Sequence, residues 1–255
     1  MINWKKYGSK ENKLWGTSIL LVTIIAYAYG LMTVKYRIFP YRQIRYIKHM
    51  VIKNNPKVKN GLIAGHSKHP RFYYLAKKSF FEINGTKADI VMIGDSITDA
   101  ADWDELFPNI SIVNRGISGD TTEGVLHRMA SIYSTNAKKA FIMIGINDLS
   151  ENIPISRILY NYEQIVVQLK QHGVTPHIQS ILLVGNKNAY LNKNIVKLNS
   201  KLKELSKKEH VVFIDLNKVF ANNGMLKPTY SSRDGIHLNG EGYFTWKNSI
   251  KNFIE

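Results

Sequence analysis

A serine that could act as a nucleophile lies at the end of an apolar run in this chain. Residues 88–98 read ADIVMIGDSIT, a pattern that predicts a buried strand ending in a tight Gly94-Asp95-Ser96 turn. A turn from a strand into a helix is where an α/β protein can expose a hydroxyl at the carboxyl edge of its sheet. Ser96 is therefore the candidate nucleophile, although a serine at such a place is also a common helix N-cap.

A serine hydroxyl needs a base, and the base needs an acceptor that orients it. Among eight histidines His237 is the best candidate, because Asp234 lies three residues before it and can hold one ring nitrogen. The other ring nitrogen would then face Ser96. An Asp-x-x-His pair can also bind a metal, but no glutamate or second histidine lies at ligand spacing, so we expect no metal site.

Attack on an ester carbonyl creates an oxyanion, which requires hydrogen-bond donors aimed at it. Gly116 follows the second expected strand, and its backbone N–H can approach closely because glycine has no side chain. Asn147 follows the third strand and offers its side-chain amide, and the N–H of Ser96 would be the third donor. The structural alternatives are a plain turn at Gly116 and a loop cap at Asn147. Ser118 is a rival nucleophile, but it lacks the G-x-S-x-G spacing of a nucleophile elbow.

Strands alternate with helices from about residue 70, which predicts a parallel sheet covered on both faces. The expected strands are 89–93, 110–113, 140–144, 177–184 and 211–214. The expected helices are 71–83, 121–133 (capped by Asp120 or Thr121), 155–171, 193–207 and 240–254, with a loop over 221–235. The loops that carry the candidate residues should meet at the carboxyl edge of such a sheet.

These residues fall into four blocks that resemble those of the SGNH, or GDSL-type, hydrolase family. The blocks occur in order within about residues 85–254: Gly94-Asp95-Ser96, Gly116, Gly145-Ile146-Asn147-Asp148 and Asp234-Gly235-Ile236-His237. The run NRGISGDTT at 114–122 is similar to the branch of platelet-activating-factor acetylhydrolase catalytic subunits and bacterial carbohydrate acetylesterases.

The resemblance implies a three-layer α/β/α flavodoxin-like sandwich with a five-stranded parallel sheet. It further implies that the enzyme needs no cofactor and forms an acyl-enzyme on Ser96. In this family's terms His237 is the base and Asp234 its orienter, and Gly116 and Asn147 belong to the oxyanion hole.

The first 70 residues lie outside the resemblance and have a different composition. Residues 1–60 carry a net charge of +11, against +5 for the other 195 residues, which favours an anionic membrane surface over nucleic acid as partner. Residues 14–34 are 21 residues without a charge, enough for one transmembrane helix. We therefore expect a basic tail (1–13), a transmembrane helix (14–34), a basic juxtamembrane segment (35–69) and a hydrolase domain (70–255). Within the third part, residues 35–60 would contact anionic lipid headgroups, or form a solvated linker.

The function expected from these features is a single-pass membrane-anchored serine ester hydrolase. It would remove a short acyl group, acetyl first, from a carbohydrate or lipid-like ester. The alternatives are an O-acyltransferase acting on a cell-surface glycan with the same residues, and a non-catalytic, membrane-tethered binding module. The short lysine-rich tail resembles a signal anchor that leaves the domain outside the cytoplasm, whereas the more basic C-terminal flank of the span favours the cytoplasmic side.

Overall fold

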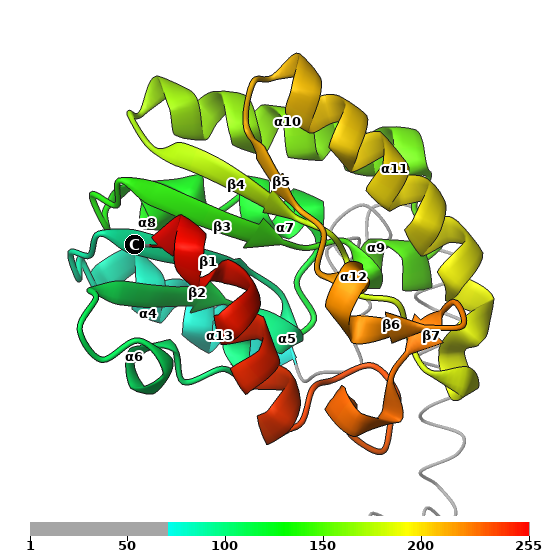
Figure 1. Ribbon diagram of the computed structural model, residues 1–255. Helices are drawn as coiled ribbons and strands as arrows, with labels where there is room; N and C mark the ends of the chain where they lie inside the picture. The colour runs from blue at the N-terminus through cyan, green and yellow to red at the C-terminus, as the bar shows by residue number, and fades with distance from the viewer. Residues whose placement is uncertain (1–70, 255) are drawn as a thin grey trace, which may run out of the picture. The chain divides into compact units, whose positions relative to one another are not determined.

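A five-stranded parallel sheet forms the centre of the computed structural model, which describes residues 71–254 (Figure 1). Its strands, in chain order, are β1 (Ile90–Gly94), β2 (Ile112–Gly116), β3 (Lys139–Met143), β4 (Thr175–Gln179) and β5 (Val212–Ile214). They lie in the order β2-β1-β3-β4-β5, and every neighbouring pair is parallel. The five-stranded parallel sheet predicted from the sequence is confirmed.

Alternate residues of the central strand enter two separate cores. In β1, Val91 and Ile93 belong to one core, and Ile90 and Met92 belong to the other. All four side chains are at most 2% exposed. Because side chains of a strand alternate between its faces, both faces of this sheet are covered, which gives the three layers.

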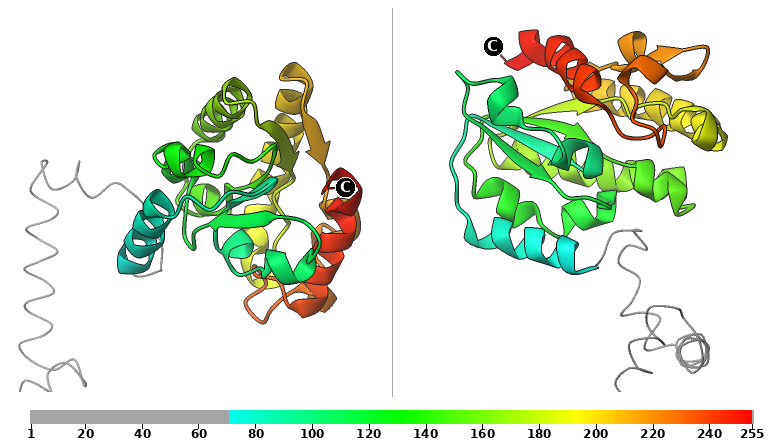
Figure 2. Two further views of the ribbon diagram at one scale, coloured as in Figure 1. Left: turned by 90° about the vertical axis from the view of Figure 1, so that its left-hand side faces the viewer. Right: turned by 90° about the horizontal axis from the view of Figure 1, so that it is seen from below.

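Helices cover the two faces of the sheet as two sets. The first core is covered by α7 (Thr122–Leu126), α8 (Met129–Tyr133), α9 (Ile146–Ser150), α10 (Ile155–Gln171) and α11 (Asn192–Lys208). The second is covered by α5 (Ser96–Asp99), α6 (Trp103–Leu106), α12 (Asn217–Phe220) and α13 (Gly240–Ile254). Figure 2 shows α10 and α11 on one side of the sheet and α13 on the other. The first described helix, α4 (Arg71–Ile83), contacts α8.

The helix expected over 121–133 is interrupted, which corrects the prediction. Thr121 caps α7 by accepting a hydrogen bond from the N–H of Gly124 at 3.2 Å. The chain then leaves the helical conformation at Arg128, whose φ of −128° and ψ of 18° separate α7 from α8. Asp120, the other candidate cap, does not cap α7.

Strand β4 ends at Gln179, five residues before the expected end at Val184. Residues 181–184, which follow, are apolar and buried. Asparagine side chains make the hydrogen bonds to their backbone that a neighbouring strand would otherwise make. Asn199 and Asn217 bond the backbone of Ile181, and further asparagine contacts reach Leu183 and Val184. Apolar character predicted burial here correctly, but it could not distinguish a strand from a segment bonded by side chains.

The expected loop over 221–235 contains regular structure of its own. A two-stranded antiparallel hairpin, β6 (Ala221–Asn222) with β7 (Met225–Leu226), is followed by the 3₁₀ helix η3 (Pro228–Tyr230). A second 3₁₀ helix, η2 (Asn186–Leu191), leads into α11. None of the helices within residues 71–254 has the length and apolar character needed to cross a membrane. The transmembrane helix expected at 14–34 and the basic segment at 35–69 lie outside the described residues.

Candidate active site

Ser96, His237 and Asp234 form a continuous series of hydrogen bonds. Ser96 begins α5 directly after β1, and its Oγ lies 2.8 Å from Nε2 of His237. Nδ1 of the same ring lies 2.5 Å from Oδ2 of Asp234. The structure thus brings together a hydroxyl and an imidazole that are 141 residues apart in the chain. This geometry allows the imidazole to accept the hydroxyl proton while the carboxylate holds its other nitrogen.

The Asp234 carboxylate is fixed by several donors. Its Oδ1 accepts hydrogen bonds from the Ser232 hydroxyl at 2.7 Å and from the N–H groups of Ile236 and His237 at 2.9 and 3.0 Å. Partial burial raises the pKa of this carboxyl, but the bonds from His237, Ser232 and the backbone outweigh burial and hold the pKa well below its usual range. The carboxylate is therefore ionised and oriented toward the ring.

A neighbouring segment holds the loop that carries His237 and Asp234. The N–H of Gly185, which follows β4, donates to the carbonyl of Gly235 at 2.7 Å. Asn188 of η2 donates its side-chain amide to the carbonyl of Asp234 at 2.9 Å. The loop is thus held by the segment that connects β4 to α11. The sequence offered no signal for this contact.

The N–H of Gly116 is not available to a substrate, contrary to the sequence-based expectation. It donates to Oδ1 of Asn114 at 2.8 Å. A Cβ on Gly116 would stand 2.4 Å from the backbone nitrogen of Asp99, so this glycine allows β2 to pack closely against the end of α5. The observed role of Gly116 is therefore close backbone packing.

Three other donors, the N–H of Ser96 itself among them, have capacity to spare. Within residues 71–254, neither the N–H of Ser96 nor that of Gly119 donates a hydrogen bond. Gly119 has a φ of +80°, the left-handed region that favours glycine. Asn147 of α9 donates Nδ2 to the carbonyl of Asp120 at 2.8 Å, and the second hydrogen of that amide is left over. The N–H of Ile117 donates to the carbonyl of Gly94 at 3.1 Å. This bond places the loop of residues 117–121, here called the Gly119 loop, beside the end of β1.

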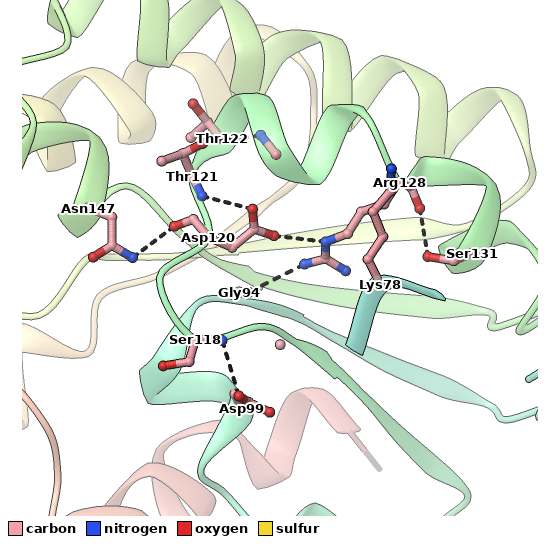
Figure 3. A network of polar contacts seen from close by, with 12 residues as sticks. Lys78, Gly94, Asp99, Ser118, Asp120, Thr121, Thr122, Arg128, Ser131 and Asn147 are labelled. Carbon is pink, nitrogen blue, oxygen red and sulfur yellow. Dashed lines mark hydrogen bonds and ion pairs between the residues drawn. The ribbon is translucent and has the colours of Figure 1, made fainter. Parts of the chain in front are cut away.

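Each of these three donor residues is next in sequence to a buried aspartate. Asp95, Asp120 and Asp148 are each at most 2% exposed, and burial raises the pKa of all three, to about 7 for Asp95 and about 6 for Asp148. Asp148 accepts from the hydroxyl of Thr122 at 2.5 Å and from its N–H, which joins the start of α7 to α9. Asp120 pairs with Arg128, as Figure 3 shows.

Ser118, the rival nucleophile, and three large aromatic residues have other surroundings. Trp103 and Phe107 are core residues, and the Trp103 ring meets that of Trp246 edge-on at 4.9 Å. Tyr190 is 73% exposed on η2. Ser118 is buried, and its N–H donates to Asp99 at 3.1 Å. Among residues 71–254 there is no group of three or more histidine and acidic side chains that could hold a metal ion.

A three-layer α/β/α domain that carries a hydrogen-bonded serine, histidine and aspartate has the architecture of a serine hydrolase. The model of the GDSL-like Lipase/Acylhydrolase family matches residues 92–243, more than half of the chain. The chain belongs to this family, and the resemblance seen in its four sequence blocks is confirmed.

Two curated relatives illustrate the similarity. The platelet-activating factor acetylhydrolase IB subunit alpha2 of Rattus norvegicus is 27% identical over 184 residues, covering 69% of this chain and 77% of the relative. The N-acylneuraminate cytidylyltransferase of Streptococcus agalactiae is 22% identical over 179 residues, covering 70% of this chain and 42% of the relative. The chain thus matches about four tenths of the length of that streptococcal relative.

Two solved structures share the fold. One, from Streptococcus pneumonia, carries a name that refers to platelet activating factor. Its TM-score is 0.67 at 27% identity, and the match covers 81% of this chain and 99% of that one. The other is an acetylxylan esterase from Geobacillus stearothermophilus, with a TM-score of 0.55 at 19% identity, covering 67% and 95% of the two chains. At 19% identity the second likeness concerns the fold alone.

Proposed function

We propose that this protein is a membrane-anchored serine ester hydrolase that removes a short acyl group, acetyl first, from a carbohydrate or lipid-like ester. The observation that carries the chemistry is the 2.8 Å contact between Ser96 Oγ and His237 Nε2. The acetyl preference is supported by the relative named platelet-activating factor acetylhydrolase. Membrane anchoring is supported by the uncharged run at 14–34 and the basic residues on both sides of it.

In the first half of the reaction, His237 Nε2 removes the proton of Ser96 as its Oγ attacks the ester carbonyl carbon. The carbonyl oxygen becomes an oxyanion, which accepts hydrogen bonds from the N–H of Ser96, the N–H of Gly119 and the amide of Asn147. The carbon–oxygen bond to the alcohol then breaks, and the imidazolium returns the proton to the leaving oxygen. The products are the free alcohol and an acyl group esterified to Ser96.

In the second half, His237 removes a proton from water, whose oxygen attacks the acyl carbon of the intermediate. The second tetrahedral oxyanion uses the same three donors. It collapses by breaking the bond to Ser96 Oγ, which takes the proton back from the imidazolium and releases the carboxylic acid. Gly119 takes the place expected for Gly116, because the Gly116 N–H already has a partner in Asn114.

The chemical proposal is tested by comparing Ser96→Ala with Ser118→Ala in the full chain, using p-nitrophenyl acetate as substrate. Ser96→Ala is expected to lower kcat at least about 10³-fold, by analogy with the loss of a triad nucleophile. Ser118→Ala removes a hydroxyl 22 residues further along and keeps the backbone N–H, so its activity should match wild type. Full activity in Ser96→Ala would refute the assignment. Acyl transfer to an added sugar in preference to water would instead identify an O-acyltransferase.

The proposed location is a single-pass anchor with the catalytic domain outside the cytoplasm, and it is open to a direct test. The chain has no cysteine, so one introduced at Lys207 on α11 is the sole target for a thiol reagent. A membrane-impermeant maleimide should label Lys207→Cys in intact cells. Labelling only after the cells are opened would place the domain on the cytoplasmic side, and extraction of the protein by alkaline carbonate would contradict the anchor.

A further inference from the structure

Arg128 is a buried cation at the interruption between α7 and α8. The residue is 1% exposed, its Nε donates to Oδ2 of Asp120 at 2.8 Å, and its Nη2 donates to the carbonyl of Gly94 at 3.4 Å. Figure 3 shows the guanidinium in contact with both groups, with Asn147 on the far side of Asp120. One side chain thus contacts the loop after β2 and the last residue of β1.

Each backbone segment that Arg128 reaches adjoins an oxyanion donor. Asp120 directly follows Gly119, and its carbonyl accepts the Asn147 amide at 2.8 Å. Gly94 lies two residues before Ser96, and its carbonyl also accepts the N–H of Ile117, at the start of the Gly119 loop. The guanidinium is therefore linked to all three proposed donors, in each case through one or two intervening groups.

The energetics of this ion pair argue against a purely stabilising role. Burying two charges has a desolvation cost that a close contact only partly offsets, and apolar residues of similar volume often give equal stability. Here Nη1 of Arg128 has no hydrogen-bond partner within residues 71–254, so the pairing is incomplete. Stability alone therefore does not account for a buried ion pair at this position.

We propose that Arg128 is a positioning residue for acyl transfer. Through Asp120 and Gly94 it holds the Ser96, Gly119 and Asn147 donors at the separations that a tetrahedral oxyanion requires. This inference rests on the proposed ester hydrolysis at Ser96. A shift of about 1 Å in a catalytic group can cost about 10²-fold in rate. Loss of the Arg128 contacts should therefore lower kcat by about that factor, while KM for the ester changes less than about twofold.

The test compares Arg128→Met, Arg128→Lys and Asp120→Asn in the full chain. Each variant is assayed for kcat and KM per active site, with active sites counted by stoichiometric fluorophosphonate labelling after prolonged reaction. Affinity for a trifluoromethyl ketone, which binds a serine hydrolase as a tetrahedral oxyanion, is the second readout. We expect kcat and ketone affinity to fall together in Arg128→Met and Asp120→Asn. Arg128→Lys should recover part of both, because its ammonium keeps the charge but not the two-point contact.

The matched control is a buried residue in the second core, which α13 covers. Trp246→Phe removes a buried 2.6 Å hydrogen bond to Gln179 and should lower stability without changing kcat per active site. The proposal is overturned if the folded Arg128 and Asp120 variants keep wild-type kcat and ketone affinity, or if the only change is fewer active sites. Should Arg128→Met fail to fold, Arg128→Lys and Asp120→Asn decide the matter. An inactive wild type, or an active Ser96→Ala, would instead defeat the proposed function itself.

Discussion

The backbones of Gly185 and Gly235 meet with no side chain between them, and the N–H of Gly185 donates to the carbonyl of Gly235 at 2.7 Å. A Cβ on Gly185 would stand 3.2 Å from the Cα of Gly235, closer than ordinary van der Waals contact. Gly235 lies between Asp234 and His237, whereas Ser96 lies on α5. A displacement at this contact therefore moves the base relative to the nucleophile.

Gly185→Ala is expected to lower kcat by about three- to tenfold, because the loop must shift by a few tenths of an ångström. KM should be nearly unchanged, since the substitution adds one methyl group away from Ser96. Steady-state kinetics on a short acyl ester measures the effect. The control is Gly85→Ala, where an added Cβ meets no atom within 4 Å and activity should match wild type. Equal kinetics for the two variants would show that this glycine contact does not position His237.

Asp234→Asn should lower kcat by about 10²-fold, because an amide cannot orient and stabilise the imidazolium as the carboxylate does. The loss should be smaller than for a fully buried triad carboxylate, since this side chain is 48% exposed and water can partly replace it. Ser232→Ala is the control, because it removes one 2.7 Å bond to the carboxylate and keeps the charge. We expect Ser232→Ala to lose less than about threefold; a loss as large as that of Asp234→Asn would assign the effect to the loop.

The depressed pKa of Asp234 also predicts a change of stability with pH. A carboxyl whose pKa is lower in the folded state stabilises the fold above its unfolded pKa of about 4. That contribution is lost as pH falls through the folded value. The difference in unfolding free energy between wild type and Asp234→Asn should therefore be constant from pH 5 to 8 and shrink below about pH 4. A difference that grows in acid would contradict the observed hydrogen bonds to this carboxylate.

Much of the architecture could be predicted from the sequence, because a short apolar run indicates a strand that is buried on both faces. The run around Val91 predicted a strand buried on both faces, and the turn at Ser96 follows it as expected. The proximity of Ser96 and His237 could be expected too, because loops that follow parallel strands share one edge of the sheet.

The features that the sequence did not reveal depend on which partner each polar group finds in three dimensions. Asp120 and Thr121 looked equally suited to cap a helix, yet Thr121 caps α7 and Asp120 pairs with Arg128. Gly116 looked like a free donor until Asn114, two residues earlier, was seen to occupy its N–H. Such choices depend on side-chain distances that residue type and spacing do not specify.

The proposed role of Gly119, in place of Gly116, as an oxyanion donor can be tested at a single backbone atom. Replacing one glycine by glycolic acid, introduced by semisynthesis, turns its backbone N–H into an ester oxygen and removes one donor. At position 119 we expect kcat to fall by about 10²- to 10³-fold, the usual effect of losing one oxyanion donor. At position 116 the same change removes only the bond to Asn114, so kcat should fall less than about tenfold. The reverse ranking would return the role to Gly116.

The raised pKa of Asp95 predicts how the stability of the fold changes between acid and neutral pH. Burial raises its pKa to about 7, so the folded protein holds a proton that the unfolded chain releases at about pH 4. Stability should therefore fall as pH rises from about 4 to 7 and level off above, by an amount on the order of a few kcal/mol. Asp148, whose pKa burial raises to about 6, adds to the same trend.

Asp95→Asn should remove most of this dependence, because the amide can still accept the 3.0 Å bond from the N–H of Ile97 without a charge to desolvate. Urea unfolding at pH 5 and pH 8, followed through the buried Trp103 and Trp246, measures the change. Asp104→Asn, which removes an exposed carboxylate on α6, controls for the loss of one charge. We expect Asp95→Asn to be more stable than wild type at pH 8 and close to it at pH 5. A variant that is less stable than wild type at pH 8 would mean that the Asp95 carboxylate is ionised and stabilised in the folded protein.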